Sequence, residues 1–416
     1  MDYYNILELQ GINKNDIKKY YCLSENNQVI LFVELFSNQR TCPNCKNSFV
    51  QLKEYKHKCI TALPLANRET IIDFYLPRYK CKICNLTYTH KLNTSSNNRI
   101  LKPVIDQLLI DFQSLSTFSD LAKKYFLSPN TIIDLFDKYC PNKRAKMSDV
   151  LCIDEFSNIR KSDNKYACML LDFSSHKIID IIKNRTLPYL RQYFSKQPLS
   201  LRDNVKYIIT DMYDGYITIA TEFFHNAIIA IDAFHYMTYF TNAIQNIRRR
   251  IFNSHNIYLN DTSWMGKHWR LLSTNPKNYP SNNMILPNGQ VISYYDRVIK
   301  FVKQNKELEY AFWLLQDFFF VSNKLTYDNA ISYIPFIINN MINSNIPELI
   351  ECGNTWLHYQ EYIINSFIKF NGVRLSNGPI EGVNSRVKAL KKLYCGYRDE
   401  QRFYNRIILI VNAKRE

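Results

Sequence analysis

Two Cys-x-x-Cys pairs constrain this chain more than any other feature of its sequence. They are Cys42-Pro-Asn-Cys45 and Cys81-Lys-Ile-Cys84. A two-residue gap lets both thiolates of a pair reach one ion, and two pairs complete a tetrahedral Zn²⁺ site. The residues between the pairs alternate enough to supply a β-hairpin, so we expect a zinc ribbon with a structural zinc ion. The alternative is two redox-active or chance pairs, but the βαβ pattern of thioredoxin-like proteins is missing.

The charge of the chain favours a polyanionic partner. Its 416 residues include 53 Lys and Arg against 37 Asp and Glu, a formal net charge of +16. Nucleic acid is the first candidate for such a partner, and a merely basic soluble protein is the alternative. The sequence shows neither a secretion signal nor an apolar run long enough to span a bilayer. We therefore expect a cytoplasmic protein without a membrane partner.

Residues 117–139 predict two short helices. Ser128-Pro129 supplies an N-cap followed by Pro at the first helical position of the second helix. The order fits a helix-turn-helix, although Phe126 stands where the tight turn usually prefers Gly. An ordinary helical hairpin is the alternative. If the second helix reads DNA, its groove and phosphate contacts are Asn130, Thr131 and Lys138.

The predicted secondary structure changes at residue 150, where short apolar strands come first and then alternate with helices. The expected strands are 150–156, 166–173, 177–182, 205–210 and 227–231, with helices at 187–194 and 213–224. Three antiparallel strands followed by alternating helix and strand is the order of the α/β ribonuclease-H-like fold. The first and fourth strands are adjacent in that order, so Asp154 and Asp211 should face one another. The long stretch from Asp232 to Glu381 predicts a helical insertion at about 245–370.

Carboxylates at neighbouring strand ends repel each other, and a divalent metal removes that conflict while supporting phosphoryl transfer. Each aspartate alone could be an ordinary turn residue. The candidate for a third carboxylate is Glu381, in a helix opened by Gly378-Pro379. Glu381, Asn384 and Lys388 share its polar face, opposite an apolar face at helical spacing. A solvated amphipathic helix is the alternative.

The expected insertion carries cations and tryptophans. Arg248, Arg249 and Arg250 could follow DNA phosphates, and an exposed Trp could stack on a flipped base. The tryptophans in this span are Trp264, Trp269, Trp313 and Trp356. Such residues more often belong to the core, which is the reading we favour.

Four motifs in register resemble bacterial insertion-sequence transposases of the ISL-three (ISL3) family. The first is Ile153-Asp154-Glu155-Phe156, followed by Arg160-Lys161, Tyr166-Ala167 and Leu171-Asp172. The second is Thr210-Asp211-Met212-Tyr213, and the third is Asp232-Ala233-Phe234-His235. The fourth runs from Asn377-Gly378-Pro379-Ile380-Glu381 through Asn384 to Lys388, Lys391, Lys392 and Gly396-Tyr397-Arg398. The cysteine pairs and the two short helices also stand in the family's order, so the resemblance covers roughly residues 40–412.

This resemblance implies a DDE-type DNA transposase with two-metal chemistry. Asp154, Asp211 and Glu381 match the acidic triad that binds two Mg²⁺ (or Mn²⁺) ions. Glu155, which a regular strand would point to the opposite face from Asp154, has a supporting role. The other supporting residues are Asp232, His235, Asn384 and Lys388. Further cations that would contact DNA are Lys391, Lys392 and Arg398.

The implied enzyme binds the inverted-repeat ends of its element, cleaves double-stranded DNA and joins strands, as a homodimer or larger assembly on DNA. It would act in the cytoplasm of a prokaryote, on the nucleoid. The expected organisation is an N-terminal segment (1–40), a zinc ribbon (41–98), a helix-turn-helix domain (99–147) and a catalytic domain (148–416). A non-catalytic DNA-binding regulator, or a ribonuclease-H-like nuclease without strand transfer, is the alternative. The acidic set argues for an enzyme, because a regulator has no use for it.

Overall fold

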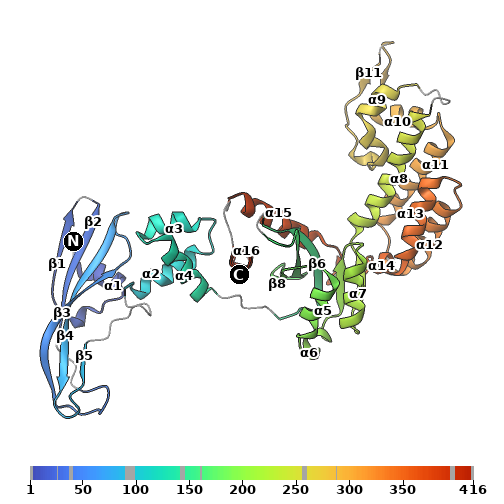
Figure 1. Ribbon diagram of the computed structural model, residues 1–416. Helices are drawn as coiled ribbons and strands as arrows, with labels where there is room; N and C mark the ends of the chain where they lie inside the picture. The colour runs from blue at the N-terminus through green and yellow to red at the C-terminus, as the bar shows by residue number, and fades with distance from the viewer. Residues whose placement is uncertain are drawn as a thin grey trace. The chain divides into compact units, whose positions relative to one another are not determined.

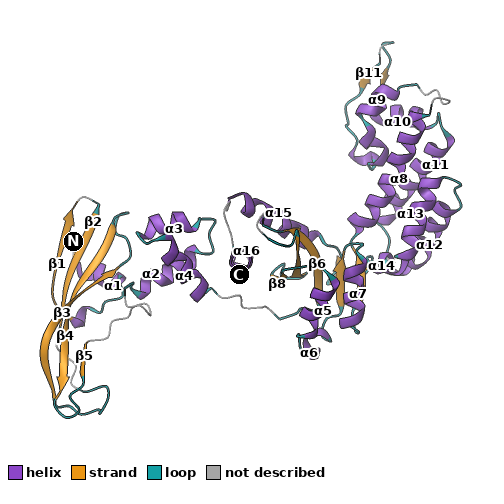
Figure 2. Ribbon diagram, in the orientation of Figure 1, coloured by secondary structure: helices purple, strands orange, loops and turns teal. Residues whose placement is uncertain are grey.

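A computed structural model describes residues 3–25, 27–36, 41–89, 99–140, 146–159, 162–254, 260–286, 288–393 and 399–413. The chain forms two compact units. Unit 1 consists of residues 1–143 and 387–416, and unit 2 of residues 144–386. Figure 1 labels the elements along the chain, and Figure 2 separates helices from strands. No helix in the described ranges has the length and apolar character needed to cross a bilayer.

A five-stranded sheet forms the first half of unit 1. Its strands are β1 (Ile17–Glu25), β2 (Gln28–Leu35), β3 (Val50–Thr61), β4 (Glu69–Cys81) and β5 (Thr87–Thr89), preceded by α1 (Tyr3–Leu9). The order is β1-β2-β4-β3, with β5 also paired to β4. The expected hairpin is present as the antiparallel pair β3 and β4. The strands of the first 40 residues join the same sheet, because β2 runs parallel to β4.

Three helices follow the sheet and share its core. They are α2 (Lys102–Asp111), α3 (Phe118–Tyr125) and α4 (Pro129–Tyr139). The hydroxyl of Thr117 accepts from the backbone N–H of Asp120 and caps α3, and Ser128 caps α4 in the same way. Phe126 ends α3 in the left-handed region at φ 55°, the conformation for which Gly is the usual residue. The two predicted helices and the tight turn between them are therefore present.

A helix from far along the chain completes unit 1. α16 (Glu400–Ala413) lies against α2, α3 and α4. The Arg406 side chain is 1% exposed, and its guanidinium carbon lies 5.3–5.7 Å from the ring centres of Phe112, Phe118 and Phe136. Its Nη2 donates to the carbonyl oxygens of Ser114 and Ser116, at 3.2 and 2.9 Å. The helical part of unit 1 is thus built from two distant segments.

Unit 2 is built on a second five-stranded sheet. Its strands are β6 (Val150–Ser157), β7 (Tyr166–Asp172), β8 (Ile178–Ile182), β9 (Tyr207–Thr210) and β10 (Ile228–Ile231). The order is β10-β9-β6-β7-β8. β6, β7 and β8 are antiparallel neighbours, whereas β9 runs parallel to both β6 and β10. The predicted adjacency of the first and fourth strands of this region is confirmed.

Helices cover this sheet and extend beyond it. Those that alternate with the strands are α5 (Leu187–Ser195), α6 (Leu199–Arg202) and α7 (Asp214–Phe223). A helical array follows β10, formed by α8 (Ala233–Asn253), α9 (Thr262–Lys267), α10 (Tyr294–Val302), α11 (Lys306–Ser322), α12 (Tyr327–Ile342), α13 (Pro347–His358) and α14 (Gln360–Asn365). Two short hairpins, β11 (Met284–Ile285) with β12 (Val291–Ile292) and β13 (Lys369–Phe370) with β14 (Val373–Arg374), interrupt it. The array and the sheet share one apolar core, in which Trp356 is fully buried.

The last helix of this region is α15 (Gly378–Leu393), and the boundary between the units falls within it. Its buried residues recur at helical spacing: Ile380, Val383, Val387 and Leu390. This is the apolar face that the sequence predicts. Glu381 and Asn384 belong to the first part of the helix, in unit 2, where they lie near the sheet.

Candidate active site and candidate metal centre

The register of the unit 2 sheet brings three aspartates to one level. Val150 of β6 is opposite Tyr207 of β9, which is opposite Ile228 of β10. If the same residue-by-residue pairing is continued past the ends of the strands, Asp154 lies opposite Asp211 and Asp211 lies opposite Asp232. Asp154 near the end of β6, and Asp211 and Asp232 directly after β9 and β10, therefore lie at the same edge of the sheet.

Asp154 is the most strongly perturbed of these carboxyls. Burial raises its pKa to about 7, and the charges of Asp211, Glu155 and Glu381 act in the same direction. Its Oδ1 accepts from the backbone N–H of Glu155 at 2.7 Å, which opposes the rise. The electrostatic neighbours of Asp154 therefore include both other members of the predicted triad, although one of them lies 227 positions later in the sequence.

Asp211 follows the last residue of β9. Burial raises its pKa, while the charges of His235 and Arg185 lower it. The Glu381 carboxyl on α15 behaves similarly, because burial and the charge of Asp232 raise its pKa and His235 lowers it. His235 is thus an electrostatic neighbour of both groups. No three carboxylates in the described chain have oxygen atoms all within 4.8 Å of one another.

Asn384 links α15 to the strand that carries Asp154. Its Nδ2 donates to Asp154 Oδ2 at 2.8 Å and to the carbonyl oxygen of Glu155 at 3.1 Å. Its Oδ1 is buried and has no hydrogen-bond partner in the part of the chain that the structure describes. A buried acceptor without a donor is costly in a folded protein. This oxygen is a candidate ligand atom on the side chain that also contacts Asp154.

Asp232 has a positioning role in this structure. Its Oδ2 caps α8 by accepting from the backbone N–H of Phe234 at 3.0 Å, and its Oδ1 accepts from the N–H of Asn377 at 2.7 Å. Asn377 in turn accepts from the N–H of Glu381 through its carbonyl oxygen. Asp232 therefore fixes the turn from which the helix of Glu381 starts.

Arg185, a residue that the sequence reasoning did not single out, stands beside this cluster. Its Nη1 donates to Glu155 Oε2, so the adjacent carboxylates of Asp154 and Glu155 have different partners. It belongs to the loop between β8 and α5, and nothing in the local sequence distinguishes it from other loop arginines. Only the position of that loop in the strand order could have indicated its proximity to the site.

The predicted DNA-contacting residues differ in their availability. Asn130 is exposed at the start of α4, and Lys138 is exposed near the end of the helix. The hydroxyl of Thr131 is hydrogen-bonded to that of Ser128 at 2.8 Å. Lys388 and Lys392 are exposed on α15, and Lys391 is half-buried. Arg398, like Arg160 and Lys161, lies outside the described residues.

The three consecutive arginines of α8 have different environments. Arg250 is engaged by two carboxylates, with hydrogen bonds of 2.7 Å to Glu348 and 2.6 Å to Glu307. Arg248 donates to Gln245 and lies over the ring of Phe252. Arg249 is exposed, and the bond that it makes is to the neutral amide of Asn246. Of the three, Arg249 is the most available to a phosphate.

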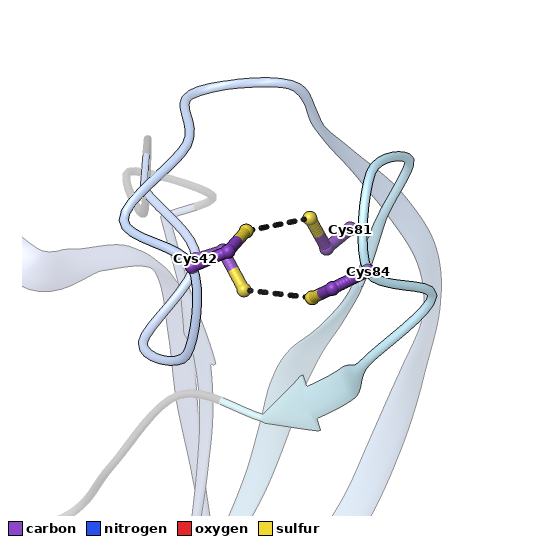
Figure 3. Close-up of side chains that lie close together, drawn as sticks. Cys42, Cys81 and Cys84 are labelled. Atoms are coloured by element: carbon purple, nitrogen blue, oxygen red, sulfur yellow. Dashed lines mark hydrogen bonds between the residues drawn. The ribbon is translucent and has the colours of Figure 1, made fainter.

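The four cysteines converge in unit 1 at the open end of the β3–β4 hairpin, opposite its turn. Figure 3 shows Cys42, Cys81 and Cys84 at this place. Cys42 Sγ lies 3.6 Å from Cys84 Sγ, and Cys45 Sγ lies 3.5 Å from Cys81 Sγ. All four sulfur atoms lie within 4.8 Å of one another. The backbone N–H of Leu86 lowers the pKa of Cys84 to about 6, which favours the thiolate. This donor set could hold one tetrahedral metal ion.

Comparison with known proteins agrees with the geometry of unit 2. The family model DDE_Tnp_ISL3, described as a transposase, matches residues 151–407. The match includes Asp154, Asp211, Asp232 and Glu381. No curated protein matches the chain.

Proposed function

This chain belongs to the ISL3 family of DDE transposases, and we propose from that premise that it binds the inverted-repeat ends of its element, cleaves them and joins them to target DNA. In this proposal unit 2 is a ribonuclease-H-like catalytic domain with the helical array as its insertion. Asp154, Asp211 and Glu381 form the catalytic triad. The enzyme acts on DNA as a homodimer or larger assembly, because two element ends must be processed.

The observation that carries this proposal is that the charges of Asp211 and Glu381 both act on the carboxyl of Asp154. β6, β9 and α15 are far apart in sequence, yet their acidic residues perturb one another electrostatically. Asp154 and Asp211 are half-buried and Glu381 is exposed, and like charges brought together in this way favour binding of a compensating cation. A DNA-binding regulator would not need such a cluster.

The residues fit a pair of divalent cations such as Mg²⁺ or Mn²⁺. Carboxylate and amide oxygens are the ligands that these hard ions prefer, and Asn384 Oδ1 is a buried acceptor with no donor in the described chain. Asp154, Asp211 and Glu381 would hold the ions. When bound, the ions supply charge stabilisation to the attacking and leaving oxygens of an in-line displacement at phosphorus.

The chain's own groups prepare this site. Asn384 holds one oxygen of Asp154 at 2.8 Å, which leaves the orientation of the carboxylate fixed before any ion arrives. Asp232 sets the start of α15 and hence the position of Glu381. His235 places a ring near both Asp211 and Glu381, where a positive charge would favour an approaching phosphate.

We also propose that the four cysteines bind a structural Zn²⁺ and that α3 and α4 form a helix-turn-helix that contacts DNA. Four thiolates leave no open coordination position, which fits a structural ion and not a catalytic one. The exposed start of α4, with Asn130, would enter the major groove.

The test uses the full chain and a DNA duplex containing the sequence that flanks its own gene. With Mg²⁺, we expect cleavage at the element end and joining to a second duplex. Asp154→Asn, Asp211→Asn and Glu381→Gln should each abolish both steps and leave DNA binding in Ca²⁺ intact. Glu222→Gln is the matched control. Glu222 forms an exposed ion pair with Arg191 on α5 and is not one of the proposed triad residues.

Three results would change the conclusion. Cleavage without joining indicates a nuclease. Specific binding without cleavage indicates a regulator. Normal cleavage by any of the three triad variants contradicts the assignment of that residue.

A further inference from the structure

Arg185 is held between two tyrosine rings beside the acidic cluster. Its guanidinium carbon lies 4.7 Å from the ring centre of Tyr166 and 5.1 Å from that of Tyr213. Tyr166 is the first residue of β7, and Tyr213 comes two residues after Asp211. Three separate segments therefore converge on one cation. A planar guanidinium can stack on both rings, whereas the compact ammonium of lysine cannot do so in the same way.

The ring of Tyr213 can occupy this position because residue 215 is a glycine. A Cβ atom at Gly215 would lie 2.4 Å from Cε1 and 2.7 Å from Cζ of Tyr213, so any larger residue would displace the ring. Tyr213 also packs edge-on against the buried ring of Tyr216, at 5.1 Å between centres. The stacking surface is thus fixed by its neighbours and does not depend on Arg185.

Most of the guanidinium is free to bind something else. In the described part of the chain, Glu155 is its sole hydrogen-bond partner, through one of five N–H donors. The side chain is 31% exposed, and that of Glu155 is 24% exposed. A half-exposed ion pair contributes little to stability. The ion pair with Glu155 alone therefore does not account for the placement of Arg185.

The surroundings of Arg185 indicate the class of ligand. Its charge acts on Asp211, so it lies close to a residue of the proposed triad. A DNA phosphate that approaches Asp154, Asp211 and Glu381 meets several negative charges, and a nearby fixed cation offsets that repulsion. Arginine binds phosphate oxygens with two parallel N–H groups, a geometry that a stacked guanidinium presents without further ordering.

We propose that Arg185 binds a backbone phosphate of DNA next to the bond that is cut, and that Glu155 holds Arg185 ready when DNA is absent. This inference deepens the proposed function and rests on it. Tyr166, Tyr213 and Gly215 are positioning residues that act through Arg185. The ligand is a phosphodiester oxygen and not a base, so the contact is independent of DNA sequence.

The test pairs protein variants with DNA duplexes that each carry one uncharged methylphosphonate near the cleavage point. Binding of the full chain is measured in Ca²⁺ and cleavage in Mg²⁺. We expect one methylphosphonate position at which wild-type binding and cleavage fall about tenfold, the value of one charge-assisted hydrogen bond. In Arg185→Gln, binding to unmodified DNA falls similarly, and the same methylphosphonate has no further effect. A purely structural loss would not remove the response to one phosphate.

Several variants separate the possible causes. Arg185→Lys should restore only part of the binding, and Gly215→Ala should weaken the same phosphate contact by displacing Tyr213. Arg191→Gln is the matched control, because Arg191 pairs with Glu222 and stacks on no tyrosine in the described chain. Its response to every methylphosphonate should equal that of the wild type. Thermal unfolding of each variant shows whether it is folded.

The inference is overturned if the effects of Arg185→Gln and of every methylphosphonate simply multiply, or if Arg185→Gln binds and cleaves like the wild type. Failure of the proposed function looks different. In that case the wild-type protein does not cleave its end DNA, while the binding measurements still show whether Arg185 contacts a phosphate.

Discussion

At the scale of single residues, an amide connects the proposed catalytic helix to the sheet. Asn384 makes two hydrogen bonds to the strand of Asp154 and keeps a third polar atom, Oδ1, buried without a partner in the described structure. We propose that this oxygen is a ligand atom for a metal ion held with Asp154.

We predict that Asn384→Ala slows cleavage by at least about tenfold and raises the Mn²⁺ concentration needed for half-maximal rate. The change removes a ligand atom and frees Asp154 to turn. Stability should fall by about 1–3 kcal/mol, because two buried acceptors lose their donor. Initial cleavage rates against Mn²⁺ concentration and urea unfolding measure the two effects. The control is Ser385→Ala on the exposed face, and an unchanged Mn²⁺ dependence would contradict the role given to Asn384.

Local patterns predicted much of this site. The strand order predicted that the strands before Asp154 and Asp211 are adjacent, and the pairing of β6 with β9 confirms that adjacency. The apolar spacing behind Glu381 also matches the buried face of α15. The contacts of Arg185 could not be predicted, because they depend on how side chains from three separate segments pack together. The rings of Tyr166 and Tyr213 meet only in the folded unit, and local sequence carries no signal for such a meeting.

At the scale of elements, the β3–β4 hairpin and the four cysteines that flank it allow the proposed zinc site to be tested. The sulfur atoms of its two pairs approach within 3.5–3.6 Å, a spacing at which four thiolates without a cation would repel one another. The end of the β3–β4 hairpin has few buried apolar side chains of its own. We therefore expect a bound ion to hold the two turns together.

We predict about one zinc ion per chain in freshly purified, reduced protein, measured by elemental analysis. Cys81→Ser should lose most of it, because three thiolates hold the ion more weakly than four. Cys59→Ser is the control, since Cys59 lies on β3 away from the cluster and should leave the zinc content unchanged. Zinc-free protein of normal stability would contradict a structural site.

The docking of α16 can be tested by one side chain. We predict that Arg406→Ala lowers the stability of unit 1 by about 3 kcal/mol, as expected when a large buried side chain leaves a cavity. Arg406→Met should cost less, because methionine fills part of the space between Phe112, Phe118 and Phe136. Guanidinium unfolding of the full chain measures both. Asn405→Ala, a neighbour on the less buried side of α16, is the control, and equal stability of all three variants would refute the docking.

At the scale of the whole molecule, the excess of cations governs binding to any DNA. The chain carries 53 basic and 37 acidic side chains, and neutralising phosphates releases counterions. We predict that affinity for a random duplex falls steeply and linearly with salt on logarithmic axes, and that element-end DNA shows a similar slope with higher affinity. Filter binding or fluorescence anisotropy from 50 to about 200 mM salt measures both slopes. Equal affinity for both duplexes would argue against recognition of the ends.

The two-segment construction of unit 1 could not have been predicted from the sequence. The expected organisation ended the DNA-binding part near residue 147, because local pattern shows where helices are but not which distant helix covers them. α16 reads as an ordinary amphipathic helix. Its partners, Phe112 and Phe136 among them, lie more than 250 positions earlier. A fragment of residues 1–143 therefore lacks the helix that completes the core of unit 1.

This construction has a consequence for how the protein is made. While the ribosome is still translating residues 144–386, α16 has not yet been synthesised. The α2–α4 helices then lack their packing partner, and the rings of Phe112, Phe118 and Phe136 are not yet covered by Arg406. A product of premature termination keeps these rings exposed and becomes a target for chaperones and proteases. It would not persist as a competitor that occupies element ends without cutting them. Because Arg406 comes late in the chain, the core of unit 1 can be completed only after the whole of unit 2 has been synthesised.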